Sequence, residues 1–166
     1  MSDARATAND TRIRVAECAV GGAGILSTIG LGSCVAIALY DATARVGGLA
    51  HILLPDRSMA RIATNPAKFP DTAVPHLLGQ MRRLGASPSR VRAKIVGGAS
   101  MFEGAVEPGT TKVGDRNVEA TRNALAASSI PIDAEDVGGD HGRSVFLHLD
   151  DGRVEVRSAR AETRVL

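Results

Sequence analysis

Cys34 and His51 are the two residues of this sequence whose types and spacing offer nucleophilic chemistry. Cys34 begins the apolar run 34–40, and His51 lies in a second apolar run, 46–54, with a polar stretch between the two runs. If the chain reverses at residues 42–43, the runs form an antiparallel hairpin in which Cys34 lies directly opposite His51. Side chains in that relation have Cβ atoms about 4.5–5.5 Å apart. An imidazole so placed can hold a cysteine as the thiolate, which is the nucleophilic form.

Two further features lie close to Cys34 in the sequence. Gly30, Gly32 and Ser33 form a flexible approach to the cysteine, and the N–H groups of Gly32 and Ser33 are candidates for an oxyanion hole. Thr28 can orient His51, as a third group does in a catalytic triad. Each residue also has a plain structural alternative, because cysteine is often a buried small hydrophobe and threonine is common in strands.

Composition places the chain among ordinary globular proteins. It has 166 residues, of which 44% are hydrophobic and 23% charged, enough for one domain with a real core. A net charge of +2 and only 2% aromatic residues argue against nucleic-acid binding. The polar N-terminus lacks the apolar segment of a signal peptide, and the apolar runs fall far short of the roughly 20 residues of a membrane span. We therefore expect a cytoplasmic protein without membrane insertion.

The remaining cysteine and histidines suggest no second site. Cys18 has no histidine near it in the sequence and is interpreted as structural. The sequence contains no Cys-x-x-Cys motif, and its four histidines are scattered. A structural zinc site is therefore not expected, and we expect no metal and no cofactor.

Hydrophobic periodicity predicts a mixed α/β (α+β) fold with two amphipathic helices. The first helix is expected from Asp71 to about Leu84, and the second begins at Asp115 with Val118, Thr121, Ala124 and Leu125 on its inner face. Residues 56–70 are expected to form a surface loop, and residues 1–11 a frayed tail. Strands are expected at 12–20, 25–29, 34–40, 46–54, 91–96, 144–149 and 153–157, the last two as a hairpin around Asp151-Gly152.

Six motifs follow one another along the sequence: Thr28–Ala36 (TIGLGSCVA), Gly48–Pro55 (GLAHILLP), Lys68–Asp71, Ala93–Phe102, Gly114–Val118 and Ala134–Gly139. In these motifs and their order the sequence resembles the CheD family, the chemoreceptor glutamine deamidases of bacterial chemotaxis. The resemblance covers roughly residues 12–157, which we expect to be a single domain, with flexible tails at 1–11 and 158–166.

The resemblance implies that Cys34, His51 and Thr28 are catalytic and that the protein converts receptor glutamines to glutamates through a thioester. It implies layered β-sheets related to the deamidase domain of cytotoxic necrotizing factor toxins. The implied partners are the cytoplasmic helices of methyl-accepting chemoreceptors and a CheC-type phosphatase. Three alternatives stay open: a mainly regulatory partner of such a phosphatase, another cysteine hydrolase such as a peptidase or amidase, and a structural domain in which Cys34 is simply buried.

Overall fold

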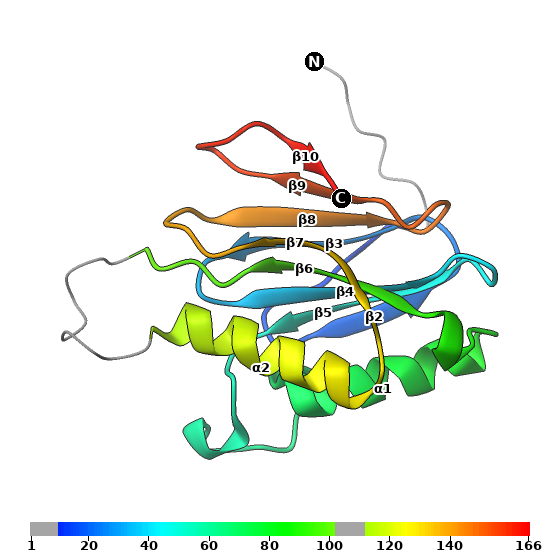
Figure 1. Ribbon diagram of the computed structural model, residues 1–166, viewed down its shortest axis with the longest axis horizontal. Helices are drawn as coiled ribbons and strands as arrows, with labels where there is room; N and C mark the ends of the chain where they lie inside the picture. Colours follow the sequence, from blue (N-terminus) through cyan, green and yellow to red (C-terminus); the bar gives the residue numbers. More distant parts are fainter. Residues whose placement is uncertain (1–9, 102–111) are drawn as a thin grey trace.

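The computed structural model describes residues 10–101 and 112–166, in which two β-sheets and two helices form three layers (Figure 1). The first sheet consists, in spatial order, of β1 (Thr11–Arg12), β3 (Ile25–Leu31), β8 (Arg143–His148), β9 (Val154–Arg157) and β10 (Arg164–Val165). The second consists of β2 (Cys18–Gly21), β5 (Val46–Ile52), β4 (Val35–Asp41), β6 (Arg92–Gly97) and β7 (Ile132–Val137). The predicted mixed α+β fold with layered sheets and two helices is confirmed.

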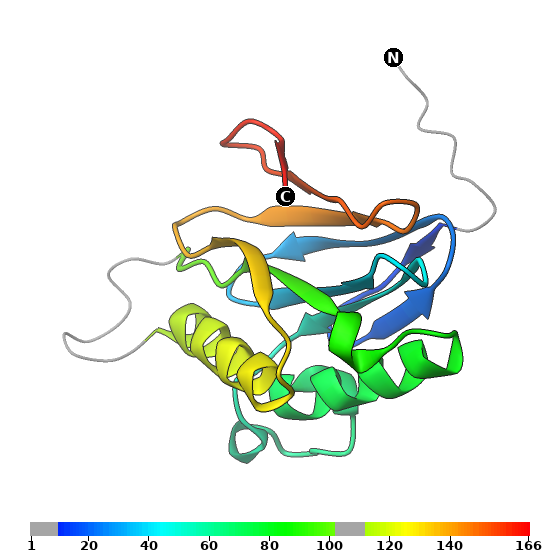
Figure 2. The ribbon, with the colours of Figure 1, turned by 45° about the vertical axis from the view of Figure 1, so that its right-hand side comes forward.

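The helices α1 (Pro70–Arg83) and α2 (Val113–Ala127) both cover the outer face of the second sheet, as the turned view in Figure 2 also shows. Short 3₁₀ turns occupy the connections: η1 (Arg57–Met59), η2 (Pro66–Lys68) and η3 (Pro88–Arg90). Both helices lie within a few residues of their predicted positions. The four residues expected on the inner face of α2 are all buried.

Alternation along β4 divides the core in two. Val35, Ile37 and Leu39 point to the helices, whereas Ala36 and Ala38 point to the space between the sheets. Because side chains in a strand alternate between faces, Cys34 points with the alanines to the space between the sheets. That space is filled from the first sheet by residues such as Leu26 and Val145.

The β4–β5 hairpin forms as predicted, but its register is shifted by two residues. Asp41 pairs with Val46, so the loop has four residues rather than two, and His51 lies opposite Ala36 instead of Cys34. The Asp41 carboxylate causes the difference, since its Oδ1 accepts hydrogen bonds from the N–H groups of Thr43 and Ala44 and stabilises the longer turn. Burial alone would raise the pKa of Asp41, but hydrogen bonds from Arg90 and from backbone N–H groups outweigh it and lower that pKa to about 2.

The prediction of one strand over 12–20 is wrong, because the chain passes from the first sheet to the second within these residues. β1 pairs with β3 in the first sheet, and β2 pairs with β5 in the second. Ala16, with φ of 61°, lies in the bend between them. β7 had no counterpart among the predicted strands. Apolar and polar residues alternate poorly along its sequence, and its parallel pairing with β6 fixes it in place.

The ends of the chain depart in part from the predicted tails. Residues 1–9 of the expected N-terminal tail lie outside the described residues, as does Phe102 of the family motif. At the other end, β10 pairs with β9, and Leu166 and Val154 exchange two backbone hydrogen bonds. The last residues are therefore an edge strand rather than a flexible tail.

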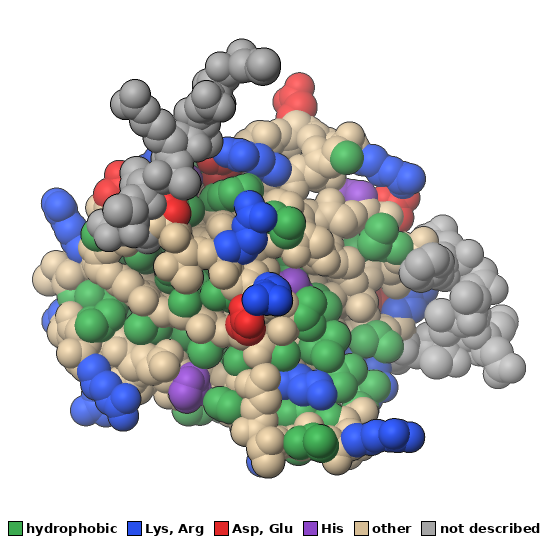
Figure 3. Space-filling view, turned by 180° about the vertical axis from the view of Figure 1, so that it is seen from behind, with side chains coloured by type: hydrophobic (Ala, Val, Ile, Leu, Met, Phe, Trp, Pro, Cys, Tyr) green, Lys and Arg blue, Asp and Glu red, His purple; other side chains and the backbone are tan. Residues whose placement is uncertain are grey.

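Within the described residues, no helix is both long and apolar enough to cross a membrane. On the face shown in Figure 3, Lys and Arg side chains are scattered among apolar and acidic ones and do not gather into one patch.

Candidate active site

Cys34 and His51 project from the second sheet into the space between the sheets. Because His51 pairs with Ala36, Cys34 lies diagonally across the hairpin from it and on the same face. His51 is fully buried, and Cys34 is 9% exposed. The hairpin therefore places the two residues that sequence analysis singled out on the same face of the sheet.

Thr28 reaches His51 from the opposite sheet. Its Oγ1 lies 2.7 Å from His51 Nδ1 and 2.9 Å from the carbonyl oxygen of Ile13. A carbonyl can only accept, so the threonine hydroxyl donates to Ile13 and accepts from Nδ1–H of His51. This assigns the proton of the neutral imidazole to Nδ1 and leaves the lone pair on Nε2.

Nε2 of His51 is buried and has no hydrogen-bond partner among the described residues. The backbone of the same residue is held on both sides: His51 N–H donates to the Glu17 carbonyl at 3.0 Å, and Ala16 N–H donates to the His51 carbonyl at 2.9 Å. An imidazole fixed in position and tautomer, with a free basic nitrogen, is suited to accept a proton from a neighbouring thiol.

Burial determines the charge of both groups. It lowers the pKa of His51 to about 4, and it raises the pKa of the Cys34 thiol, against a smaller lowering by the backbone N–H of Cys34 itself. Near neutral pH the thiol and the imidazole are therefore both uncharged. The sequence-based prediction was different: a cysteine directly opposite a histidine was expected to be held as the thiolate.

Comparison with known proteins places this chain in a family. Residues 53–158 match the family described as CheD chemotactic sensory transduction. The probable chemoreceptor glutamine deamidase CheD of Clostridium novyi (strain NT) is 43% identical over 141 residues, which is 85% of this chain and 87% of that protein. The protein of the same name from Pyrococcus abyssi (strain GE5 / Orsay) is 44% identical over 149 residues, which is 89% of this chain and 91% of that protein.

The chain belongs to the CheD family. The family match begins two residues after His51, so it supports the membership but says nothing of Cys34, His51 and Thr28 themselves. Among solved structures, that of Bacillus licheniformis hypothetical protein YfiH has a TM-score of 0.45 and 16% identity, covering 72% of this chain and 50% of that one. That likeness is too low to bear on function.

In this CheD protein, the loop that precedes Cys34 is held by the segment after β6. The N–H of Gly98 donates to the Cys34 carbonyl, and that of Ala99 donates to the Gly32 carbonyl, both at 2.8 Å. Gly97 cannot be replaced without moving this loop, since a Cβ there would lie 2.3 Å from the Cys34 carbonyl oxygen. The loop with the candidate oxyanion donors is thus anchored next to the sulfur.

Sequence analysis missed Asn117, a fully buried residue of α2 whose side-chain amide contacts this loop. It lies one helical turn before Thr121, which is expected on the inner face of the helix, so its spacing already indicates an inward position. A polar residue at such a position is the signal that could have identified it.

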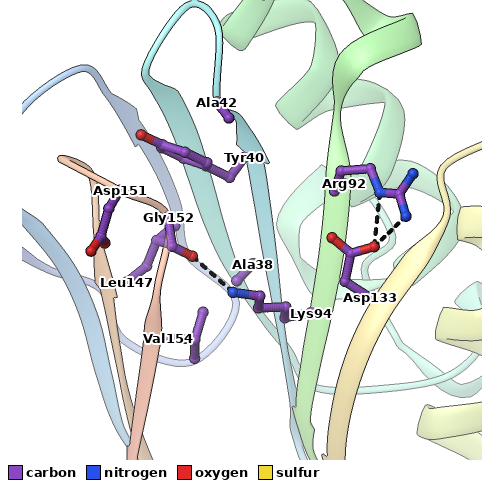
Figure 4. A pocket seen from close by; sticks show the side chains of 10 residues that line it. All are labelled: Ala38, Tyr40, Ala42, Arg92, Lys94, Asp133, Leu147, Asp151, Gly152 and Val154. Atoms are coloured by element: carbon purple, nitrogen blue, oxygen red, sulfur yellow. Dashed lines mark hydrogen bonds and ion pairs between the residues drawn. The ribbon is translucent and has the colours of Figure 1, made fainter. Parts of the chain in front are cut away.

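A separate pocket lies at the other end of β4, near its turn (Figure 4). Its lining residues include Tyr40, Arg92 and Lys94, and none of Cys34, His51 and Thr28 belongs to it. The Lys94 ammonium donates to the Gly152 carbonyl, and the Arg92 guanidinium pairs with Asp133 (Figure 4). These charged groups are already satisfied within the protein, so this pocket offers no second reactive site.

Proposed function

We propose that this protein is a chemoreceptor glutamine deamidase in which Cys34 is the nucleophile, His51 the general base and Thr28 the residue that orients the imidazole. The observation that supports this most directly is the Thr28–His51 hydrogen bond between the sheets, on the face that carries Cys34. The relatives that the chain matches are named probable chemoreceptor glutamine deamidases. In the proposed mechanism the three residues act as the nucleophile, the base and the orienting group of a cysteine-dependent acyl transfer.

The first half of the reaction forms a thioester. His51 Nε2 takes the proton from the Cys34 thiol as the sulfur attacks the side-chain carbonyl carbon of a receptor glutamine. The carbonyl oxygen becomes an oxyanion, for which the N–H groups of Gly32 and Ser33 are the candidate donors. The proton then passes from His51 to the departing nitrogen, the C–N bond breaks and ammonia leaves. A γ-glutamyl thioester on Cys34 remains.

The second half releases the product. Water occupies the place that ammonia left, His51 takes one of its protons, and the oxygen attacks the thioester carbon. The C–S bond breaks and the proton returns from His51 to sulfur. The carboxylic acid that results releases its own proton to solvent and becomes a glutamate side chain. Each turnover replaces a neutral carboxamide with a carboxylate, which adds a negative charge to the receptor and creates a methylation site.

The substrate is the cytoplasmic helical region of a methyl-accepting chemoreceptor, and the reaction takes place in the cytoplasm. Near neutral pH the mechanism starts from a neutral thiol and a neutral imidazole, as burial of both groups dictates. A CheC-type phosphatase is a regulatory partner in this proposal.

Mass spectrometry of a purified receptor cytoplasmic fragment tests the function. Incubation with the protein is expected to add about one dalton at each converted glutamine, because NH₂ is exchanged for OH, and to release one ammonia per conversion. The Cys34→Ala variant is expected to produce neither change. Absence of both signals with folded wild-type protein and the receptor of the same organism would contradict the proposal and favour the regulatory role, which a pull-down of the phosphatase would then test.

Removing the Thr28 hydroxyl is expected to slow the reaction without unfolding the protein. Thr28→Val keeps the shape of the side chain but leaves Nδ1–H of His51 without its acceptor, so the ring is free to rotate or change tautomer. Loss of a third group of this kind costs up to about 10⁴ in kcat, and we expect a fall of about 10²–10³. Steady-state ammonia release measures it, and ¹⁵N shifts of the His51 ring report the tautomer.

Thr121→Val is the matched control for this prediction. Thr121 is also fully buried, but its hydroxyl lies on α2 and has no hydrogen-bond partner among the described residues. This variant should keep kcat within about threefold of wild type, and Thr28→Ser, which retains the hydroxyl, should recover most of the activity. Equal losses in the two valine variants would contradict the orienting role.

A further inference from the structure

Asn117 connects the two strand ends that carry Cys34 and His51. Its Nδ2 donates to the carbonyl oxygen of Ser33 at 2.8 Å and to that of Leu53 at 3.2 Å. Ser33 directly precedes Cys34, and Leu53 follows His51 by two residues. One amide group therefore uses both of its hydrogens on the backbone segments next to the nucleophile and the base.

These two contacts lie where the β4–β5 ladder has ended. The last pair of that ladder joins Val35 and Ile52, so Ser33 and Leu53 lie beyond its regular hydrogen bonds. The N–H of Leu53 already turns away to the carbonyl of Lys68 at 3.1 Å. The side chain of Asn117 thus holds together two strand ends at the point where their own backbone pairing stops.

The helix that carries Asn117 is docked directly on the segment that holds the Cys34 loop. A Cβ on Gly114 would lie 2.6 Å from the carbonyl oxygens of Gly98 and Ala99, so only glycine allows α2 to approach this closely. Gly98 and Ala99 in turn donate their N–H groups to the carbonyls of Cys34 and Gly32. Movement of Asn117 relative to the loop is therefore restricted, and its two hydrogen bonds join fixed elements.

The amide is not the choice that stability alone would favour. Asn117 is fully buried, and its Oδ1 has no hydrogen-bond partner among the described residues. A buried unpaired acceptor costs free energy that an aliphatic residue of similar size would avoid. Unlike an aliphatic residue, however, asparagine donates the two hydrogen bonds to Ser33 and Leu53.

We infer that Asn117 is a positioning residue of the deamidase, which sets the separation of Cys34 and His51 by holding Ser33 and Leu53 on one amide. It approaches from the helix side of the second sheet, whereas the thiol and imidazole face the other side, so it acts through the backbone. This inference rests on the proposed function, because separation of nucleophile and base matters only if they react together. A displacement of about 1 Å in such a pair can cost about 10² in rate.

The test compares Asn117→Leu with Leu125→Ala. Leucine has the same branched arrangement of side-chain heavy atoms as asparagine, although its methyl groups are larger, and it donates nothing. Leu125→Ala instead leaves a cavity elsewhere on the inner face of the same helix. We expect Asn117→Leu to lower kcat for the receptor fragment about 10²-fold with KM changed less than about threefold. Leu125→Ala should keep kcat within about threefold, although it destabilises the protein. Unfolding in urea identifies conditions in which both variants are folded.

A second measurement separates failure of this inference from failure of the proposed function. The rate at which iodoacetamide alkylates Cys34 requires no receptor. Release of Ser33 and Leu53 should expose the buried thiol and accelerate its alkylation about tenfold in Asn117→Leu but not in Leu125→Ala. If wild type deamidates no receptor, the proposed function fails and alkylation alone decides the role of Asn117. Equal alkylation rates in the two variants, or a loss confined to KM, would overturn the inference.

Discussion

Replacing Cys34 with serine is expected to abolish glutamine deamidation, with kcat lowered by at least about 10⁴-fold. Serine retains the shape of the side chain, but its hydroxyl is far less acidic than a thiol. His51, whose pKa of about 4 makes it a weak base, is poorly matched to remove a hydroxyl proton. Ammonia release from the receptor fragment measures the loss, and unfolding in urea shows that the variant is folded.

Cys18→Ser is the matched control for Cys34→Ser. Cys18 is the other free cysteine, but it packs on the helix side of the second sheet, away from His51. Its replacement should leave kcat within about twofold of wild type. If Cys34→Ser still converted receptor glutamines at the wild-type rate, Cys34 would not be the nucleophile and the reaction would not pass through a thioester.

The neutral state of Cys34 has its own signature in alkylation. Burial raises the pKa of this thiol, and only the thiolate reacts with iodoacetamide. The rate of alkylation at Cys34, located by peptide mapping, should therefore be low at pH 7 and should keep rising beyond pH 9. A plateau already reached at pH 6 would instead show a thiolate preformed by the imidazole.

The sequence placed Cys34 and His51 on one face although it gave the wrong register. Side chains alternate with a period of two, so a shift by one residue would have sent them to opposite faces, whereas the observed shift by two keeps them together. Whether Cys34 and His51 share a face thus depends on whether the register is shifted by an even or an odd number of residues. The alternation of apolar residues along the strands determines this. The exact register depends on the turn, where the buried Asp41 selects four residues instead of two.

Contacts between elements far apart in the chain account for what sequence analysis did not provide. The Thr28–His51 bond joins two sheets, and Asn117 reaches Ser33 and Leu53 from a helix more than sixty residues later. Neither follows from local propensity, because each depends on how the layers pack. Thr28 was identified through its closeness to Cys34 and through the resemblance, whereas the signal for Asn117 was a polar residue at an inward position of a helix.

Replacing His51 with glutamine is expected to lower kcat by about 10³–10⁴-fold, because the variant has no basic nitrogen to take the proton of Cys34. Glutamine is uncharged and close to histidine in size, so the variant removes the base with a small change in side-chain volume. His76→Gln is the matched control, since His76 lies on α1 outside the site, and its kcat should stay near that of wild type. Comparable losses in the two variants would show that His51 is not the base.

The same His51 variant should also change the dependence of stability on pH. Burial lowers the pKa of His51 from its usual 6.5 to about 4, so between these values the unfolded chain binds a proton that the folded protein does not. The stabilisation is complete above pH 6.5 and is lost as the pH falls towards 4. At about 1.4 kcal/mol per pKa unit, wild type should lose about 2–3 kcal/mol more than His51→Gln between pH 7 and pH 4.5, measured by unfolding in urea. Parallel curves for wild type and His51→Gln would show that burial does not lower the pKa of this imidazole.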